Sequence, residues 1–83
     1  MSKLDKILLQ VLKAGGDQNI AFDDLLYLLE GLGFEKRIKG SHHLFSRGGI
    51  EEIINIQSSG NKAKPYQVKQ VRAVILKYHL AGE

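Results

Sequence analysis

The side chains best suited to acid–base chemistry in this chain are its three histidines, His42, His43 and His79. Free imidazole has a pKa of about 6.5, so at neutral pH it can take up or release a proton. His42 and His43 are consecutive in a predicted strand, and strand side chains alternate between the two faces of a sheet. The two rings are therefore expected to point in opposite directions and cannot act as a pair.

The alternation of side chains along the strand indicates which of these two rings is accessible. Phe45 lies two residues after His43 and shares its face of the strand, and Leu44 lies two residues after His42 and shares the opposite face. If Phe45 is the core residue, His42 lies on the sheet face away from the helices. His79 is expected in the last turn of the final helix, where it would interact with the helix dipole, and we interpret it as structural or incidental. An exposed strand histidine is more often a plain surface residue than a catalytic one, so His42 needs further support.

Residue spacing disfavours other kinds of site. No HxH, HxxxH or carboxylate–histidine cluster occurs at metal-ligand spacing, so neither a metal nor another cofactor is predicted. The segment Arg47–Ile50 lacks the glycine spacing and the lysine of phosphate-binding loops. Ser41 would need an oriented base to act as a nucleophile, and His42 beside it points the other way. The absence of cysteine excludes disulfides and thiolate metal sites.

Apolar residues at helical spacing predict two helices before this strand. The first covers Ser2–Ala14, with a capping box at its start and Gly15–Gly16 at its end. The second follows the connector Asp17–Asn19, begins near Asp23, whose carboxylate can cap free amides, and ends at Gly33. The apolar stripes of the two helices consist of Leu4, Ile7, Leu8, Val11 and Leu12, and of Leu25, Leu28, Leu29 and Leu32.

The second half of the chain has a different pattern. Three strands with glycine-containing turns between them are predicted over 34–39, 42–47 and 52–57. A loop is expected over 58–64, followed by a helix that begins at Pro65 and ends near Leu80. The apolar stripe of this helix consists of Val68, Val71, Val74, Ile75 and Tyr78.

This element order predicts one α+β domain over residues 1–83, with a three-stranded antiparallel sheet and helices packed on one face. The core is expected over 22–80, where the order α-β-β-β-α is that of double-stranded-RNA-binding domains. Residues 1–16 form an additional N-terminal helix. A domain of this size has little spare core in which to hold a cofactor.

Charge is divided unequally along the chain. Residues 1–35 hold three lysines against six acidic residues, a net charge of −3. Residues 36–83 hold nine lysines and arginines against three acidic residues, a net charge of +6. The basic half could attract a polyanion, although solvated surface lysines explain the charge about as well. Because no long apolar segment or signal-like N-terminus occurs, we expect a cytoplasmic protein that does not bind membranes.

Three segments together resemble one known family. Leu28–Phe34 ends a leucine-rich helix in Gly-Phe, Lys39–Phe45 contains Gly-Ser-His-x-x-Phe, and Gly60–Pro65 leads into a Val/Ile-rich helix. This combination is similar to the HicA (YcfA-like) toxin family over roughly residues 22–80. The resemblance implies a fold like that of double-stranded-RNA-binding domains, cleavage of mRNA by the motif histidine, and neutralisation by a HicB-type antitoxin. That histidine is His42 here.

The chain departs from this family in two places. The N-terminal helix is an addition that shorter members lack, and its role is open. Many members have a histidine after the third strand, where this chain has Ser59. We assign no catalytic role to Ser59.

RNA carries its own nucleophile, the 2′-hydroxyl, so His42 could act as a general base without a metal. Arg37, Lys39 and Arg47 flank the same hairpin and could bind phosphate or stabilise the developing negative charge. A second predicted RNA-binding group consists of Lys62, Lys64, Lys69 and Arg72. The sequence identifies no second proton donor.

Two other functions fit the same pattern. A non-catalytic RNA-binding module would use His42 only for stacking or hydrogen bonding. A protein-interaction or DNA-binding regulator would use the first or the last helix for recognition, but no helix-turn-helix spacing is evident.

Overall fold

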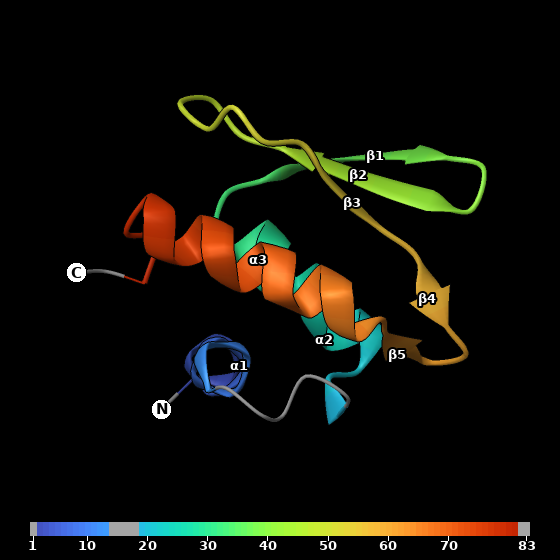
Figure 1. Cartoon of the computed structure of the whole chain (residues 1–83), viewed down its shortest axis with the longest axis horizontal. Coiled ribbons are helices and arrows are strands. Elements are labelled where there is room, and N and C mark those ends of the chain that lie inside the picture. The colour runs from blue at the N-terminus through green and yellow to red at the C-terminus, as the bar shows by residue number, and fades with distance from the viewer. Residues whose placement is uncertain (1, 14–18, 82–83) are drawn as a thin grey trace.

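The computed structural model describes residues 2–13 and 19–81 of the chain. Figure 1 shows β1, β2 and β3 as one layer above α2 and α3, with α1 on the opposite side of these two helices. This arrangement confirms the predicted α+β fold with helices on one face of a three-stranded antiparallel sheet. The elements follow in the order α1 (Lys3–Leu12), α2 (Phe22–Gly31), β1 (Glu35–Lys39), β2 (His42–Ser46), β3 (Ile54–Ile56), β4 (Ser58–Ser59), β5 (Lys62–Ala63) and α3 (Pro65–Lys77).

The three-stranded sheet has the order β1-β2-β3, and both pairs are antiparallel. Lys39 is paired with His42 across a tight turn in which Gly40 has a φ of +63°, a conformation that favours glycine. On the other side of β2, Leu44 is paired with Asn55. The third strand is shorter than the predicted 52–57, because only Ile54–Ile56 is paired.

The prediction of a plain loop over 58–64 is wrong. This segment forms the two-stranded sheet of β4 and β5. The backbone of the segment before α2 extends this pairing, since Ala63 N donates to Ile20 O at 2.9 Å and Phe22 N donates to Asn61 O at 3.0 Å. These short polar strands carry no apolar alternation, so neither their pairing with each other nor its extension by the segment before α2 gave a signal in the sequence.

The helix starts agree with prediction in two cases out of three. Ser2 caps α1 by accepting a hydrogen bond from Asp5 N at 3.1 Å, and Pro65 occupies the first turn of α3. Asp23, however, does not cap α2. The cap is Ala21, which makes no side-chain hydrogen bond, and Asp23 lies within the first turn. The contact between Phe22 N and Asn61 O supplies an acceptor from outside the helix instead of the expected carboxylate.

Two of the three helix ends differ from the sequence expectation. The α1 helix ends at Leu12. The predicted stop at Gly15–Gly16, like most of the connector that follows, lies outside the described residues. The α3 helix ends at Lys77, and His79 lies beyond it with a φ of +55°, not in its last turn. Gly33 follows α2 with a φ of +92°, as a helix-terminating glycine should.

The core lies between the inner face of the sheet and the helices. In β2 and β3, Phe45, Ile54 and Ile56 are fully buried, and α1 adds Ile7 and Val11. Burial of these apolar side chains against the helices fixes which face of the sheet remains outside. No helix in the described ranges, of which the thirteen-residue α3 is the longest, has the length and apolar character to span a bilayer. The α2 and α3 helices contribute further large core residues, namely Phe22, Leu25, Leu28, Leu29, Val68, Val71, Val74 and Ile75.

Candidate active site

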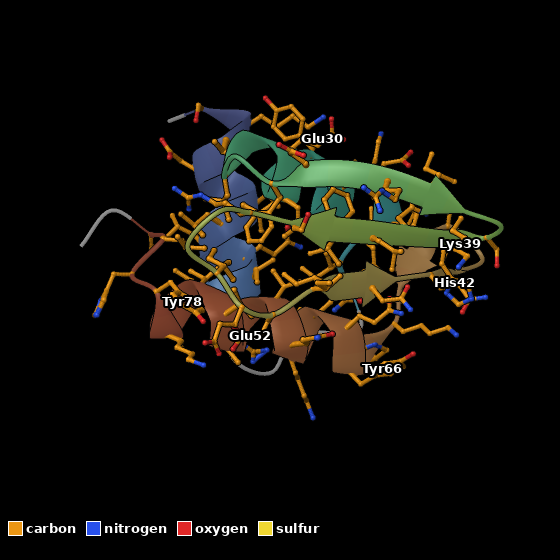
Figure 2. All side chains as sticks on the ribbon, turned by 90° about the horizontal axis from the view of Figure 1, so that it is seen from above. Glu30, Lys39, His42, Glu52, Tyr66 and Tyr78 are labelled. Carbon is orange, nitrogen blue, oxygen red and sulfur yellow. The ribbon has the colours of Figure 1, made fainter. Side chains whose placement is uncertain are left out.

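His42 lies in β2 on the outer face of the sheet, and its side chain is exposed. Its neighbour His43 points to the inner face, as the predicted alternation requires. Lys39 lies directly opposite His42 in β1, so the two side chains share the outer face. Figure 2, which looks onto this face, shows the two residues together at the hairpin end of the sheet.

Asn55 holds one nitrogen of the His42 ring. The distance between His42 Nδ1 and Asn55 Oδ1 is 3.2 Å. Asn55 is paired with Leu44, two residues from His42, and is therefore a diagonal neighbour on the same face. Because an amide oxygen can only accept, this contact assigns the proton of the neutral ring to Nδ1. The lone pair then belongs to Nε2, the nitrogen that can take a proton from another molecule.

His43 has a different environment. Its ring meets the Phe22 ring edge to face, with centroids 5.2 Å apart and planes at 76°. Its Nδ1 is buried and has no hydrogen-bond partner among the described residues. This packing gives His43 a structural role and leaves His42 as the accessible imidazole of the pair.

Two of the three predicted hairpin cations lie beside His42. Arg37 and Lys39 share its face of the sheet, both are exposed, and neither takes part in an ion pair within the part of the chain described. Arg47 is elsewhere. It follows β2 at the end farthest from His42, and its side chain lies near Gly33, where an added Cβ would be 3.6 Å from Arg47 Nε. Arg47 lies five positions along the chain from His42, a span on the order of 16 Å for extended backbone.

The residues of the second predicted basic group also do not all lie together. Lys62 in β5 and Lys69 in α3 are exposed, and Lys64, the residue before α3, is half-buried. Arg72 instead donates from Nε to Val11 O at 3.1 Å and so links α3 to α1. The structure therefore places Lys62, Lys64 and Lys69 around the start of α3 and uses Arg72 to hold the N-terminal helix.

A chain of polar contacts behind the hairpin was not predicted from the sequence. Gln67, the one buried polar side chain among the described residues, accepts from Gln57 N at 3.1 Å. Gln57 Nε2 donates to Ser41 Oγ at 3.4 Å, next to His42. Gln67 stands four residues before Val71 on the apolar stripe of α3, a position that could have identified it as buried.

A tightly paired cluster lies at the other end of the sheet, and we call it the Glu52 clamp. Glu52 accepts from Tyr78 Oη at 2.6 Å and from Lys77 Nζ at 2.9 Å. These hydrogen bonds, from Tyr78 first and then Lys77, lower the pKa of Glu52 from 4.5 to about 2, and the same carboxylate raises the pKa of Lys77. Figure 2 shows Glu52 and Tyr78 near each other, far from His42. The clamp fastens the segment before β3 to the end of α3.

The arrangement around His42 can support proton transfer at Nε2 and binding of an anion by Arg37 and Lys39. Within residues 2–13 and 19–81, no three His, Asp or Glu side chains gather in a way that could hold a metal ion.

The fold and this site define a small α+β protein with helices on one side of a sheet and an accessible histidine among cations on the other. A family model described as "HicA toxin of bacterial toxin-antitoxin" matches residues 22–78, more than half of the chain. The chain belongs to the HicA toxin family, and membership implies a HicB-type antitoxin as its partner. The match begins after α1. Comparison with curated proteins and with solved structures gave no match.

Proposed function

We propose that this protein is an mRNA-cleaving toxin in which His42 is the general base. The observation that carries the proposal is the exposed His42 ring, held at Nδ1 by Asn55 so that Nε2 is left for a substrate proton. Family membership supports the toxin role, and the basic half of the chain suits a polyanionic substrate. The cytoplasm, where mRNA is found, is the proposed place of action.

In the proposed reaction, His42 Nε2 removes the proton of a ribose 2′-hydroxyl. The 2′-oxygen attacks the adjacent phosphorus, a new P–O2′ bond forms, and the P–O5′ bond breaks. The products are a 2′,3′-cyclic phosphate and a 5′-hydroxyl, whose proton comes from solvent. Arg37 and Lys39 would stabilise the negative charge that develops on the phosphate oxygens.

Beyond the scissile phosphate, the RNA backbone would be held by the three lysines around the start of α3, Lys62, Lys64 and Lys69. Binding of this kind neutralises phosphates and releases counterions, so affinity should fall steeply with salt. Arg47 and Arg72 are not included in this surface, because one lies at the far end of β2 and the other bonds to α1.

An antitoxin would inhibit by covering the outer face of the sheet. This face carries Arg37 and Lys39 and is open to solvent. A HicB-type partner with acidic residues opposite these cations would exclude RNA from His42 by occlusion.

The proposal is tested by incubating a long RNA with purified protein in EDTA and comparing the wild type with His42→Ala. We expect the substitution to reduce cleavage by about 10² to 10⁴-fold, the usual contribution of a general base. RNA affinity and melting temperature should stay close to wild type, because the His42 side chain is exposed. His79→Ala, which removes another exposed histidine, is the matched control and should cleave normally.

Undiminished cleavage by His42→Ala would refute the assignment. If neither protein cleaves any RNA but both bind it, the non-catalytic RNA-binding module is the correct function instead.

A further inference from the structure

Tyr66 is an exposed aromatic residue that the core does not use. It lies in the first turn of α3, and 63% of its surface is accessible. The other tyrosine of this region, Tyr78, is half-buried and contributes to the Glu52 clamp. The fold therefore explains Tyr78 but gives no packing reason for Tyr66.

The ring of Tyr66 is connected to the hairpin that carries His42. Gln67 Nε2 donates to Tyr66 Oη at 3.4 Å, and the buried Gln67 is itself fixed by its contact with Gln57. Gln57 then reaches Ser41, the residue before His42. Figure 2 shows Tyr66 toward the same end of the molecule as His42 and Lys39, away from Glu52 and Tyr78. A few hydrogen bonds thus relate the position of an aromatic ring to that of the proposed base.

The surroundings of Tyr66 are basic. Lys64 stands two residues before it, Lys69 stands three residues after it, and Lys62 precedes both in β5. The sequence contains no aspartate or glutamate between Glu52 and Glu83. An exposed ring among lysines suits single-stranded nucleic acid, in which phosphates meet the cations while a base stacks on the ring. A base-paired duplex keeps its base faces stacked inside and could not use the ring in this way.

We propose that Tyr66 is a stacking platform for an unpaired nucleobase of the RNA strand that passes His42. The proposal rests on the proposed function, since it assumes that RNA is the ligand of this surface. It makes single-stranded RNA the substrate class and gives Tyr66 a binding role that is separate from the proton transfer at His42.

The test measures affinity for a single-stranded 2′-O-methyl RNA oligonucleotide, which cannot be cleaved because its nucleophile is blocked. Tyr66→Ala should weaken binding by about 5- to 150-fold, the range found for loss of one base–aromatic stack. Tyr66→Phe keeps the ring and should bind within about twofold of wild type. Tyr27→Ala removes another exposed tyrosine, on α2 beside acidic residues, and should have no effect.

Binding of inorganic polyphosphate separates stacking from charge. Polyphosphate has no bases, so Tyr66→Ala should bind it as tightly as wild type, whereas Lys69→Ala should weaken both ligands. Equal losses for RNA and polyphosphate in Tyr66→Ala, or no loss for RNA, would overturn the stacking role. Because the oligonucleotide is not cleaved, this result does not depend on whether His42 is the base. Failure of the cleavage proposal and failure of the stacking proposal can therefore be told apart.

Discussion

The two ends of the sheet use similar residues in opposite ways. At one end, the Glu52 clamp joins a carboxylate to an ammonium and a phenol of the same chain. At the other end, Arg37 and Lys39 flank His42, and the described part of the chain supplies no ion pair for either cation. Charged residues whose partners come from the same chain stabilise the fold, whereas cations left without a partner can bind another molecule.

The α3 helix contributes to this difference. Its last turn ends in Lys77, beside Tyr78, and both reach Glu52 in the segment before β3. Its first turn has no acidic residue, follows Lys64 and contains Tyr66. The same helix therefore closes one end of the molecule and leaves a basic, aromatic surface at the other.

The largest expected effect is on the strand that connects the two ends. Phe45→Ala removes a ring with no exposed surface, and such a change costs about 3 to 5 kcal/mol of unfolding free energy. Urea unfolding should show this loss of free energy. The Glu52 clamp and RNA cleavage should both be lost at the urea concentration where the protein unfolds. Ser46→Ala, at the next and exposed position, should change the unfolding free energy by less than about 0.5 kcal/mol. Equal stability for the two variants would contradict the placement of the core.

Substitution of Asn55 should affect RNA cleavage at the His42 end of the sheet and leave the Glu52 clamp unchanged. Asn55→Ala removes the acceptor of Nδ1, and the loss of one such hydrogen bond should lower kcat/KM by about tenfold. Asn55→Asp restores an acceptor with a negative charge, which stabilises the protonated ring. Because the base must be unprotonated, the acid limb of the pH–rate profile should move to higher pH. A loss of cleavage with an unchanged profile in Asn55→Asp would argue against a positioning role for Asn55.

A pair of lysines gives a direct comparison of the two ends. Lys39→Ala should lower the slope of log affinity against log salt for RNA by about one, as expected for one lost phosphate contact. Lys77→Ala should leave the slope unchanged, because Lys77 is held by Glu52. Titration of both variants with RNA at several salt concentrations measures the difference. Equal slopes for the two variants would contradict the distinction between a cation that binds RNA at one end of the sheet and a cation held by Glu52 at the other.

The smallest effect is expected for the clamp. Glu52→Gln keeps the shape of the side chain but removes its charge, and the melting temperature near neutral pH should fall by about 2 to 4 °C. The folded-state pKa of about 2 is below the ordinary 4.5, so the carboxylate contributes stability above about pH 4.5 and loses it as pH falls through 2. The difference in melting temperature between wild type and variant should therefore shrink over that range. A difference that does not change with pH would show that charge is not its source.

Much of the fold could be predicted because it depends on local patterns. The leucines of α2, the cap at Ser2 and the parity of Phe45 are set by neighbouring residues, and each is found as expected. The predicted cap of α2 at Asp23 is wrong, because Phe22 N donates instead to Asn61 O, a backbone group 39 residues along the chain. The strands β4 and β5 were missed for another reason: they pair with each other as a short hairpin whose polar residues show no apolar alternation.

The sequence by itself determined that His42 and His43 lie on opposite faces and that the basic charge belongs to the second half of the chain. Only the tertiary structure decided that Asn55 meets His42, that Arg72 binds α1, and that Tyr66 lies toward the hairpin end. Alternation along one strand depends only on covalent geometry, so it can be read from consecutive residues. Contacts between elements depend on strand register and helix packing, which many distant residues set together.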